Sequence, residues 1–416
     1  MGWSVGVVLA AVAVLLAGCM RPAAIAAPEG VKLTPLRSIS TLEARVLLAL
    51  TGVKGVSVNH AVDCYRMEYA GVGAGGQAVR LSGLLALPRG VAPRRVASFQ
   101  HGTSTTPSAI PSKPDGTGLA AAILFAGNGY ALAAPDYPGL GVSGGRHPYY
   151  VADAIGPAVV GMIDAVQRLE GVPDRPVFLA GFSEGGWASL AALQRLEARG
   201  TPVLGSAQVA GAYDLRHVSL PAALKGGAAS HTLYLAYAAW GQAAYYGHRL
   251  DSVLTPEHAA LVERLFAGAR PKEILSALPA DPRTIFNAAF LEAYDRGGAH
   301  WYLDTFAANS LADVTPRAPV RMYYGSQDKD VVPQEALGAA KAMAARGADV
   351  RAVDVGPVGH DASMLAAAPS ILAWLAELEA RGTPVLGSAQ VAGAYDLRHV
   401  SLPAALKGGA ASHTLY

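Results

Sequence analysis

Residues 177–189 read VFLAGFSEGGWAS, and this stretch decides the fold. Its first five residues form an apolar run of the length of a buried strand, and residues 185–199 are expected to form a helix. Between the two lies G-x-S-x-G, with Gly181 and Gly185 on either side of Ser183. A sharp strand-to-helix turn is crowded and needs small residues at those two positions, where it exposes the side chain between them. The pattern predicts a nucleophile at Ser183, and the alternative is a plain helix N-cap.

Apolar strands and Ala-rich helices alternate on both sides of this turn. Such alternation predicts an α/β fold in which helices flank a mostly parallel sheet. The expected strands are 95–100, 130–134, 177–181, 320–324 and 350–355, and the expected helices are 118–127, 149–169, 185–199 and 363–380.

The alternation stops at about residue 216 and returns at about 317. The stretch between, 216–316, has a helical pattern and many aromatic residues, so we expect a helical cap inserted into the sheet domain. The α/β core is then split into 63–215 and 317–381, and 19–62 is a mixed lead-in. The aromatic residues predict either an apolar substrate pocket or simply the packing of the cap itself.

A serine hydroxyl needs a base to become a nucleophile, and the base needs an acid to orient it. Among the 11 histidines, His360 is the one that follows the last predicted strand and precedes the last helix. Catalytic groups of parallel sheets lie in such loops at the carboxyl ends of strands. The alternative for His360 is a structural place beside a helix N-cap. Asp328 and Asp330 both follow the strand 320–324 and are the candidate acids.

At these residues the chain resembles the serine α/β-hydrolase superfamily, and most closely the secretory-lipase-like bacterial esterases. The segments 134–141 (APDYPGLG) and 210–215 (AGAYDL) extend the resemblance. It implies the chain order serine, acid, histidine, and its G-x-x-D pattern favours Asp328 over Asp330 as the acid.

The resemblance also implies an oxyanion hole, which needs two N–H donors. His101-Gly102-Thr103 looks like the His-Gly element of this superfamily, in which Thr103 would donate its backbone N–H. Glu184, the residue after the nucleophile, would donate the second. Gln is common at that position, but only the backbone of Glu184 is required.

The expected function is the hydrolysis of carboxylic esters through an acyl-enzyme, with a small-molecule or lipid ester as substrate. An amide- or peptide-cleaving, aminopeptidase-like enzyme is the alternative, and a noncatalytic surface lipoprotein is a third reading. No cofactor is expected, and no HExxH or clustered His/Cys spacing predicts a metal site. A net charge of +2, from 33 basic and 31 acidic residues, gives no nucleic-acid-binding signature. Oligomeric state has no signal in the sequence.

The N-terminus predicts export. Residues 5–18 are apolar but shorter than a transmembrane helix of about 20 residues. They end in Leu16-Ala17-Gly18-Cys19, which resembles a bacterial lipobox and implies a signal peptide at 1–18 and lipidation of Cys19. The protein would be secreted or anchored to the membrane of a bacterial cell envelope. Cleavage after Ala24-Ile25-Ala26 is an alternative, as is a buried N-terminal helix, since residues 1–4 lack Lys and Arg.

Residues 378–416 repeat residues 196–234 without a single change. Repeat proteins show approximate similarity over several units, because each unit adapts to its neighbours. One perfect copy indicates a recent duplication or a joining error rather than a second module. Residues 382–416, a copy of 200–234, therefore receive no function, and they could form either an extra edge strand or a loose tail.

Deleting residues 382–416 is expected to leave folding and ester hydrolysis intact, because the copy contributes no site that the pattern identifies. The measurement is the specific activity and the thermal midpoint of the shortened chain beside those of the full chain. Loss of folding on deletion would show that the copy has become structural.

Overall fold

A computed structural model describes residues 21–381, apart from 74–76, 114–115 and 175. The expected signal peptide 1–18, the expected lipidation site Cys19 and the repeated tail 382–416 lie outside the described residues. No helix in the described part of the chain is long and apolar enough to cross a membrane.

The described residues form two compact units. Unit 1 holds those up to His147, then Ala152–Tyr213, then those from Leu311 onward. Unit 2 holds Pro148–Val151 and Asp214–Ser310. The helical insertion expected at 216–316 thus falls largely in unit 2, while its exact limits stay a prediction.

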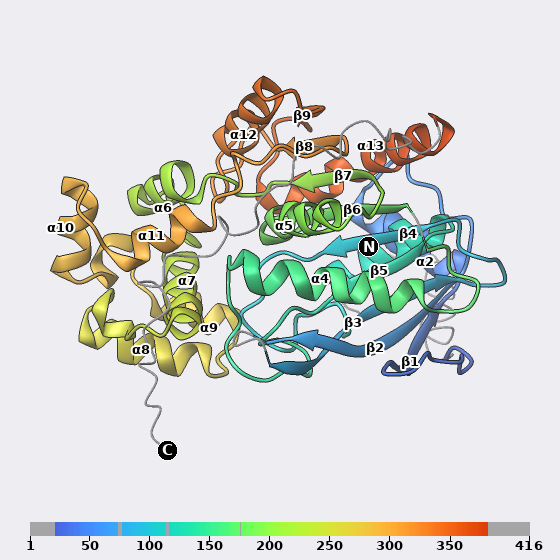
Figure 1. The fold of residues 1–416 in the computed structure, drawn as a ribbon, viewed down its shortest axis with the longest axis horizontal. Helices are drawn as coiled ribbons and strands as arrows, with labels where there is room; N and C mark the ends of the chain where they lie inside the picture. The colour runs from blue at the N-terminus through green and yellow to red at the C-terminus, as the bar shows by residue number, and fades with distance from the viewer. Residues whose placement is uncertain (1–20, 74–76, 114–115, 175, 382–416) are drawn as a thin grey trace, which may run out of the picture. The chain divides into compact units, whose positions relative to one another are not determined.

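A nine-stranded sheet forms the centre of unit 1, in the order β1-β2-β3-β5-β4-β6-β7-β8-β9 (Figure 1). The six strands from β5 to β9 in this order are parallel, whereas β1, β2 and β3 pair antiparallel with their neighbours. The α/β-hydrolase fold expected from the sequence is therefore observed. The strands are β1 Lys32–Ile39, β2 Val62–Val72, β3 Ala78–Pro88, β4 Val96–Gln100, β5 Ala131–Pro135, β6 Val177–Phe182, β7 Val203–Val209, β8 Val320–Tyr324 and β9 Val350–Asp354.

The central strands are covered on both faces, which explains their sequence. Every residue of β4, β5, β6 and β7 is buried. Such strands read as continuous apolar runs, so their pattern is easy to recognise. The expected limits 320–324 agree with β8, and the other expected strands agree with the structure to within one residue at each end.

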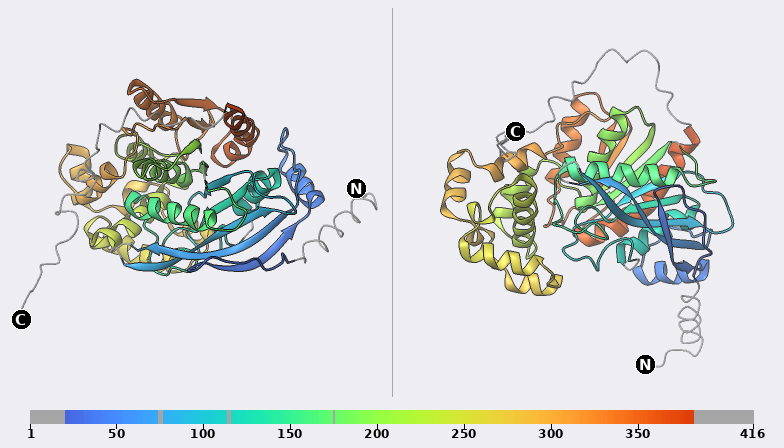
Figure 2. Two further views of the ribbon diagram at one scale, coloured as in Figure 1. Left: turned by 45° about the vertical axis from the view of Figure 1, so that its right-hand side comes forward. Right: turned by 60° about the horizontal axis from the view of Figure 1, so that its bottom comes forward.

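The three N-terminal strands were not predicted individually. β2 and β3 pair over their whole length as a long hairpin, which curves along one end of the sheet in Figure 2. β1 pairs with β2, so the stretch expected as a lead-in contributes to the sheet. The sequence of β1 gives only a weak strand signal. The strand contains Pro35, where the pairing register shifts, and it lies half-buried at the sheet edge.

Helices cover the two faces of the sheet. Helices α4 (Ala152–Gln167) and α5 (Glu184–Ala198) lie together across one face (Figure 1). Helices α2 (Thr41–Thr51), α3 (Gly116–Phe125) and α13 (His360–Arg381) contribute to the apolar core on the other. α12 (Gln334–Ala345) packs beside β9.

Unit 2 is helical. Its aromatic side chains stack on one another, for example Tyr237 on Trp240 at 5.8 Å between ring centroids and Phe286 on Phe290 at 4.4 Å. These aromatic residues therefore serve the packing of the unit itself. The helices are α6 Leu220–Lys225, α7 His231–Tyr246, α8 Pro256–Phe266, α9 Pro271–Ala277, α10 Ala288–Arg296 and α11 Trp301–Ala308.

Replacing Trp374 by Ala is expected to destabilise unit 1 by about 3–5 kcal/mol, the usual cost of removing a large core aromatic. The Trp374 ring, on α13, lies edge-on to Phe178 of β6 at 5.7 Å, and the Arg321 guanidinium stacks over it at 5.0 Å. Urea unfolding of W374A and of W374F, which keeps part of the aromatic contact, measures the effect. A loss below about 1 kcal/mol in W374A would show that α13 is not held by this contact.

Candidate active site

Ser183 occupies the sharp turn between β6 and α5. Its backbone has φ 56° and ψ −122°, a conformation that a non-glycine residue adopts only when its surroundings enforce it. A Cβ added at Gly181 would come within 2.0 Å of the Gly185 carbonyl oxygen, and one at Gly185 within 1.9 Å of the Gln100 carbonyl oxygen. Both glycines are thus required by close backbone approach, as the sequence predicts.

The Ser183 side chain points to a histidine. Its Oγ makes no capping hydrogen bond to α5, which argues against the N-cap alternative. Instead it donates to Nε2 of His360 at 2.9 Å. His360 is the first residue of α13, and its ring lies 4.9 Å from the ring of Phe182. The two side chains meet although 177 residues separate them in the chain.

Asp328 holds the other side of the imidazole. Nδ1 of His360 donates to Oδ2 of Asp328 at 2.7 Å. The second carboxylate oxygen accepts the backbone N–H groups of Asp330 and Val331, at 2.9 and 3.0 Å. The structure therefore places Asp328, not Asp330, at the histidine, and the loop fixes the carboxylate through the oxygen that does not face the imidazole.

Two opposing effects act on the pKa of His360. Burial disfavours the imidazolium and would lower the pKa. The hydrogen bond and charge of Asp328 outweigh burial, helped by the charges of Asp330 and Asp361, so that the pKa is raised above its ordinary value. An imidazolium at this position is therefore stabilised, as a general base requires once it has accepted a proton.

The two segments that carry the expected oxyanion donors, Glu184 and Thr103, both lie next to Ser183. Glu184 is the first residue of α5, and the first N–H groups of a helix have no acceptor within it. Gly102 follows β4, and a Cβ placed there would lie 3.3 Å from Cβ of Ser183. The loop that carries Thr103 therefore passes directly against the serine.

A buried stack that the sequence did not predict links these two segments. The rings of His101 and Tyr137 stack at 4.2 Å, and those of Tyr137 and His147 at 5.7 Å. The Tyr137 hydroxyl donates to the His101 carbonyl oxygen at 3.0 Å. His147 then contacts Oε1 of Glu184 at 2.8 Å, and both side chains are fully buried. The stack runs from the Thr103 loop to the residue that follows the nucleophile.

The His147–Glu184 contact requires a proton beyond those of a neutral imidazole and a carboxylate. Nδ1 of His147 lies 2.9 Å from the Pro138 carbonyl oxygen, which only accepts, so Nδ1 is protonated. The contact between Nε2 and Oε1 then needs a second proton on one of these two atoms. Either arrangement is neutral as a pair, which is how a buried carboxylate next to a nucleophile is tolerated.

His101 itself is placed to act structurally. Its Nδ1 donates to the Gly102 carbonyl oxygen at 2.7 Å. Burial lowers the pKa of His101 despite the nearby carboxylate of Glu184. The His101 ring therefore holds the loop that carries Thr103 through its contact with the backbone.

Within the described residues, no group of three or more His, Cys, Asp or Glu side chains is arranged to hold a metal ion.

Solved structures show the same fold. A protein of Legionella pneumophila, named provisionally as a hydrolase, superposes with a TM-score of 0.79 at 23% identity, covering 85% of this chain and 98% of that one. The rice cell wall degrading esterase LipA of Xanthomonas oryzae gives a TM-score of 0.74 at 23% identity, over 84% of this chain and 98% of LipA.

A more distant likeness is to Candida antarctica lipase A in its closed state, with a TM-score of 0.64 at 14% identity over 88% of this chain and 86% of the lipase. Comparison with protein-family models gave no match, and neither did comparison with curated protein sequences. At these identities the solved structures establish the α/β-hydrolase fold.

Replacing Asp328 by Asn is expected to reduce kcat/KM for an ester by about 10⁴-fold, because the amide no longer holds the imidazole in the required tautomer. Replacing Asp330 by Asn is the matched control. It removes one charge that raises the pKa of His360, so the acid limb of the pH–rate profile should move slightly to lower pH, with the plateau nearly unchanged. A larger loss of kcat/KM in D330N than in D328N would show that Asp330, and not Asp328, is the acid that orients His360.

Proposed function

We propose that this chain hydrolyses carboxylic esters through a covalent acyl-enzyme. The observation that carries the proposal is the hydrogen-bonded chain Ser183–His360–Asp328, with contacts of 2.9 and 2.7 Å, at a strained strand-to-helix turn. A nucleophile, a base and an orienting acid in this geometry are the requirements of acyl transfer.

In the proposed reaction, Oγ of Ser183 attacks the ester carbonyl while Nε2 of His360 takes its proton. The negative charge that develops on the carbonyl oxygen is stabilised by the N–H groups of Thr103 and Glu184. The imidazolium then protonates the departing alcohol, which leaves the acyl group on Ser183. Water, deprotonated by His360, attacks the acyl-enzyme and regenerates the serine.

The preference for esters over amides draws support from the solved structures. Two of the proteins with this fold are named as an esterase and a lipase. The triad geometry alone serves both bonds, so this preference rests on likeness of fold and needs a direct assay.

We also propose that the protein is exported and anchored through a lipidated Cys19. The lipobox-like residues 16–19 support this. Each described strand and helix begins at or after Lys32, so removing a leader before Cys19 leaves the described fold complete.

Replacing Ser183 by Ala is expected to lower hydrolysis of p-nitrophenyl butyrate by about 10⁴-fold or more. A fluorophosphonate probe should label the wild-type chain at Ser183 and leave S183A unlabelled. The control is Ser206→Ala, a buried serine of β7, which should keep both activity and labelling.

Full esterase activity in S183A would overturn the proposal. A parallel assay with an amino-acyl p-nitroanilide addresses the bond preference: hydrolysis of the anilide at a rate equal to or above that of the ester would replace esterase by amidase.

A further inference from the structure

The two helical layers of unit 1 differ in their surface chemistry. On the α4/α5 layer, ion pairs join Arg195 to Asp153 at 2.7 Å and Arg199 to Asp164 at 2.6 Å. Such pairs are typical of a face that water covers. The opposite layer, formed by α2, α3 and α13, has a different character.

Helix α2 exposes leucines on its outward side. Leu42 is 60% exposed and Leu50 is 79% exposed, and half-buried Val46 lies between them with the i, i+4, i+8 spacing of one helix face. The acidic residue of this helix, Glu43, is turned inward, where it is buried and paired with Arg37. α2 thus carries apolar residues on its outward side as well as toward the core, where Ala44 is buried and Leu47 and Leu48 pack.

Helix α13 continues this surface. Residues 362–376 include no Asp, Glu, Lys or Arg, although Leu365, Pro369 and Leu372 are only half-buried. The two helices adjoin, because a Cβ at Gly55, just after α2, would lie 3.6 Å from Pro369. A surface rich in apolar residues, with Arg45 and Lys54 as exposed cations near α2, therefore extends from α2 along the helix that begins with His360.

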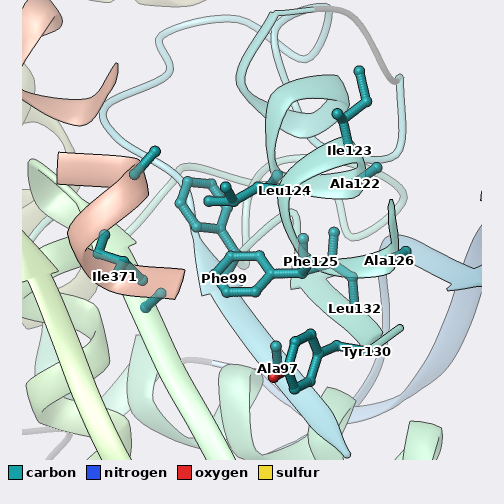
Figure 3. Packing of buried hydrophobic residues seen from close by; sticks show 14 of the residues in the cluster. Ala97, Phe99, Ala122, Ile123, Leu124, Phe125, Ala126, Tyr130, Leu132 and Ile371 are labelled. Carbon is teal, nitrogen blue, oxygen red and sulfur yellow. The ribbon is translucent and has the colours of Figure 1, made fainter. Parts of the chain in front are cut away.

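An apolar hollow of about 40 Å³ is lined by residues of this layer. Figure 3 shows Ile371 of α13 on one side and Leu124 of α3 on the other, with Phe99 of β4 between them. Half-buried Leu48 and Val53 contribute from the α2 side. The lining also includes Gly181 and Phe182, which directly precede the nucleophile. An apolar hydrocarbon would find no polar group to displace there.

We propose that the α2/α13 surface, defined by Leu42, Val46, Leu50, Val53 and Leu365, docks on a lipid bilayer. An exposed helix face of this composition matches the interfacial helices that lie in the plane of a membrane surface. Charge favours anionic headgroups: Arg45 and Lys54 are exposed, and Glu43 is the one acidic residue from 41 to 60.

The N-terminal chain leads into this helix. Ala23, four residues after the expected lipid anchor Cys19, accepts a hydrogen bond at its carbonyl oxygen from the Tyr65 hydroxyl at 3.0 Å, and the Glu29 carbonyl oxygen accepts one from Arg168 at 3.1 Å, so the chain between Ala23 and β1 lies against the protein. α2 follows β1 after one residue, so the leucines lie on the first helix beyond the tether. The docking itself does not depend on hydrolytic activity.

The test is co-sedimentation with vesicles of phosphatidylglycerol and phosphatidylcholine. It uses the chain from Met20 onward with Cys19 absent, so that no lipid anchor contributes; this chain retains every described strand and helix. Leu42→Ser with Leu50→Ser should weaken binding by about tenfold or more. The matched control, Leu337→Ser, changes a leucine that is 45% exposed on α12 and should bind like the wild type.

Two further variants sharpen the result. Arg45→Gln with Lys54→Gln should weaken binding to anionic vesicles by about fivefold per charge and leave binding to pure phosphatidylcholine unchanged. S183A should bind like the wild type, and L42S/L50S should hydrolyse soluble p-nitrophenyl acetate at the wild-type rate. Failure of docking and failure of the proposed esterase function are thereby distinguishable.

Wild-type chain that does not bind the vesicles, or L42S/L50S that binds them as tightly as L337S, would overturn the proposal. A wild-type dimer that L42S/L50S converts to a monomer in light scattering would also overturn it, since a second copy would then be the occupant of this surface.

Discussion

The close approach of two backbone segments around Ser183, the β6–α5 turn and the end of β4, is the constraint on which the rest of the site depends. The β6–α5 turn, the carbonyl of Gln100 at the end of β4 and the carbonyl of Gly185 leave no room for a Cβ at Gly181 or Gly185. This crowding holds Ser183 at φ 56° and directs its hydroxyl outward rather than onto the helix N-terminus. Nucleophile, helix N-terminus and oxyanion loop are consequently positioned together.

Buried charge around this turn is arranged in two pairs, one on each side. His360 and Asp328 form the pair that faces the serine hydroxyl, and Asp328 is fixed by two backbone N–H groups. His147 and Glu184 form the second pair, fully buried behind the turn. Because a lone buried charge is costly, each carboxylate is stabilised by its histidine, and Asp328 also by the two backbone N–H groups. The second pair also ties Glu184 to the ring stack that supports the oxyanion loop.

The sheet separates two surfaces with different tasks. The α4/α5 layer carries the ion pairs of an ordinary wet surface. On the α2/α13 layer, the exposed leucines of α2 adjoin the uncharged stretch 362–376 of α13, a helix that begins at the proposed catalytic histidine. If that layer docks on lipid, the helix that positions His360 is also part of the docking surface.

Much of this protein could be read from its amino-acid order, because the decisive signals are local. Strands buried on both faces are continuous apolar runs, so the expected 320–324 coincides with β8. The G-x-S-x-G pattern predicts Ser183 as the nucleophile, and the position of His360 after the last strand predicts it as the base. Short-range patterns carried less information for β1, where Pro35 and partial burial disguise the strand.

Only the tertiary structure decided whether Asp328 or Asp330 contacts His360. Two residues so close in sequence differ only in which side chain the loop turns toward the imidazole. It alone revealed the His147–Glu184 pair, whose members are 37 residues apart and have no local pattern in common. The outward leucines of α2 likewise needed the packed molecule, since a helix with leucines on several sides does not show in its sequence which of them the core will cover. The sequence thus determined the central strands and the turn that carries Ser183, because those signals are local, and the tertiary structure decided which distant side chains are in contact.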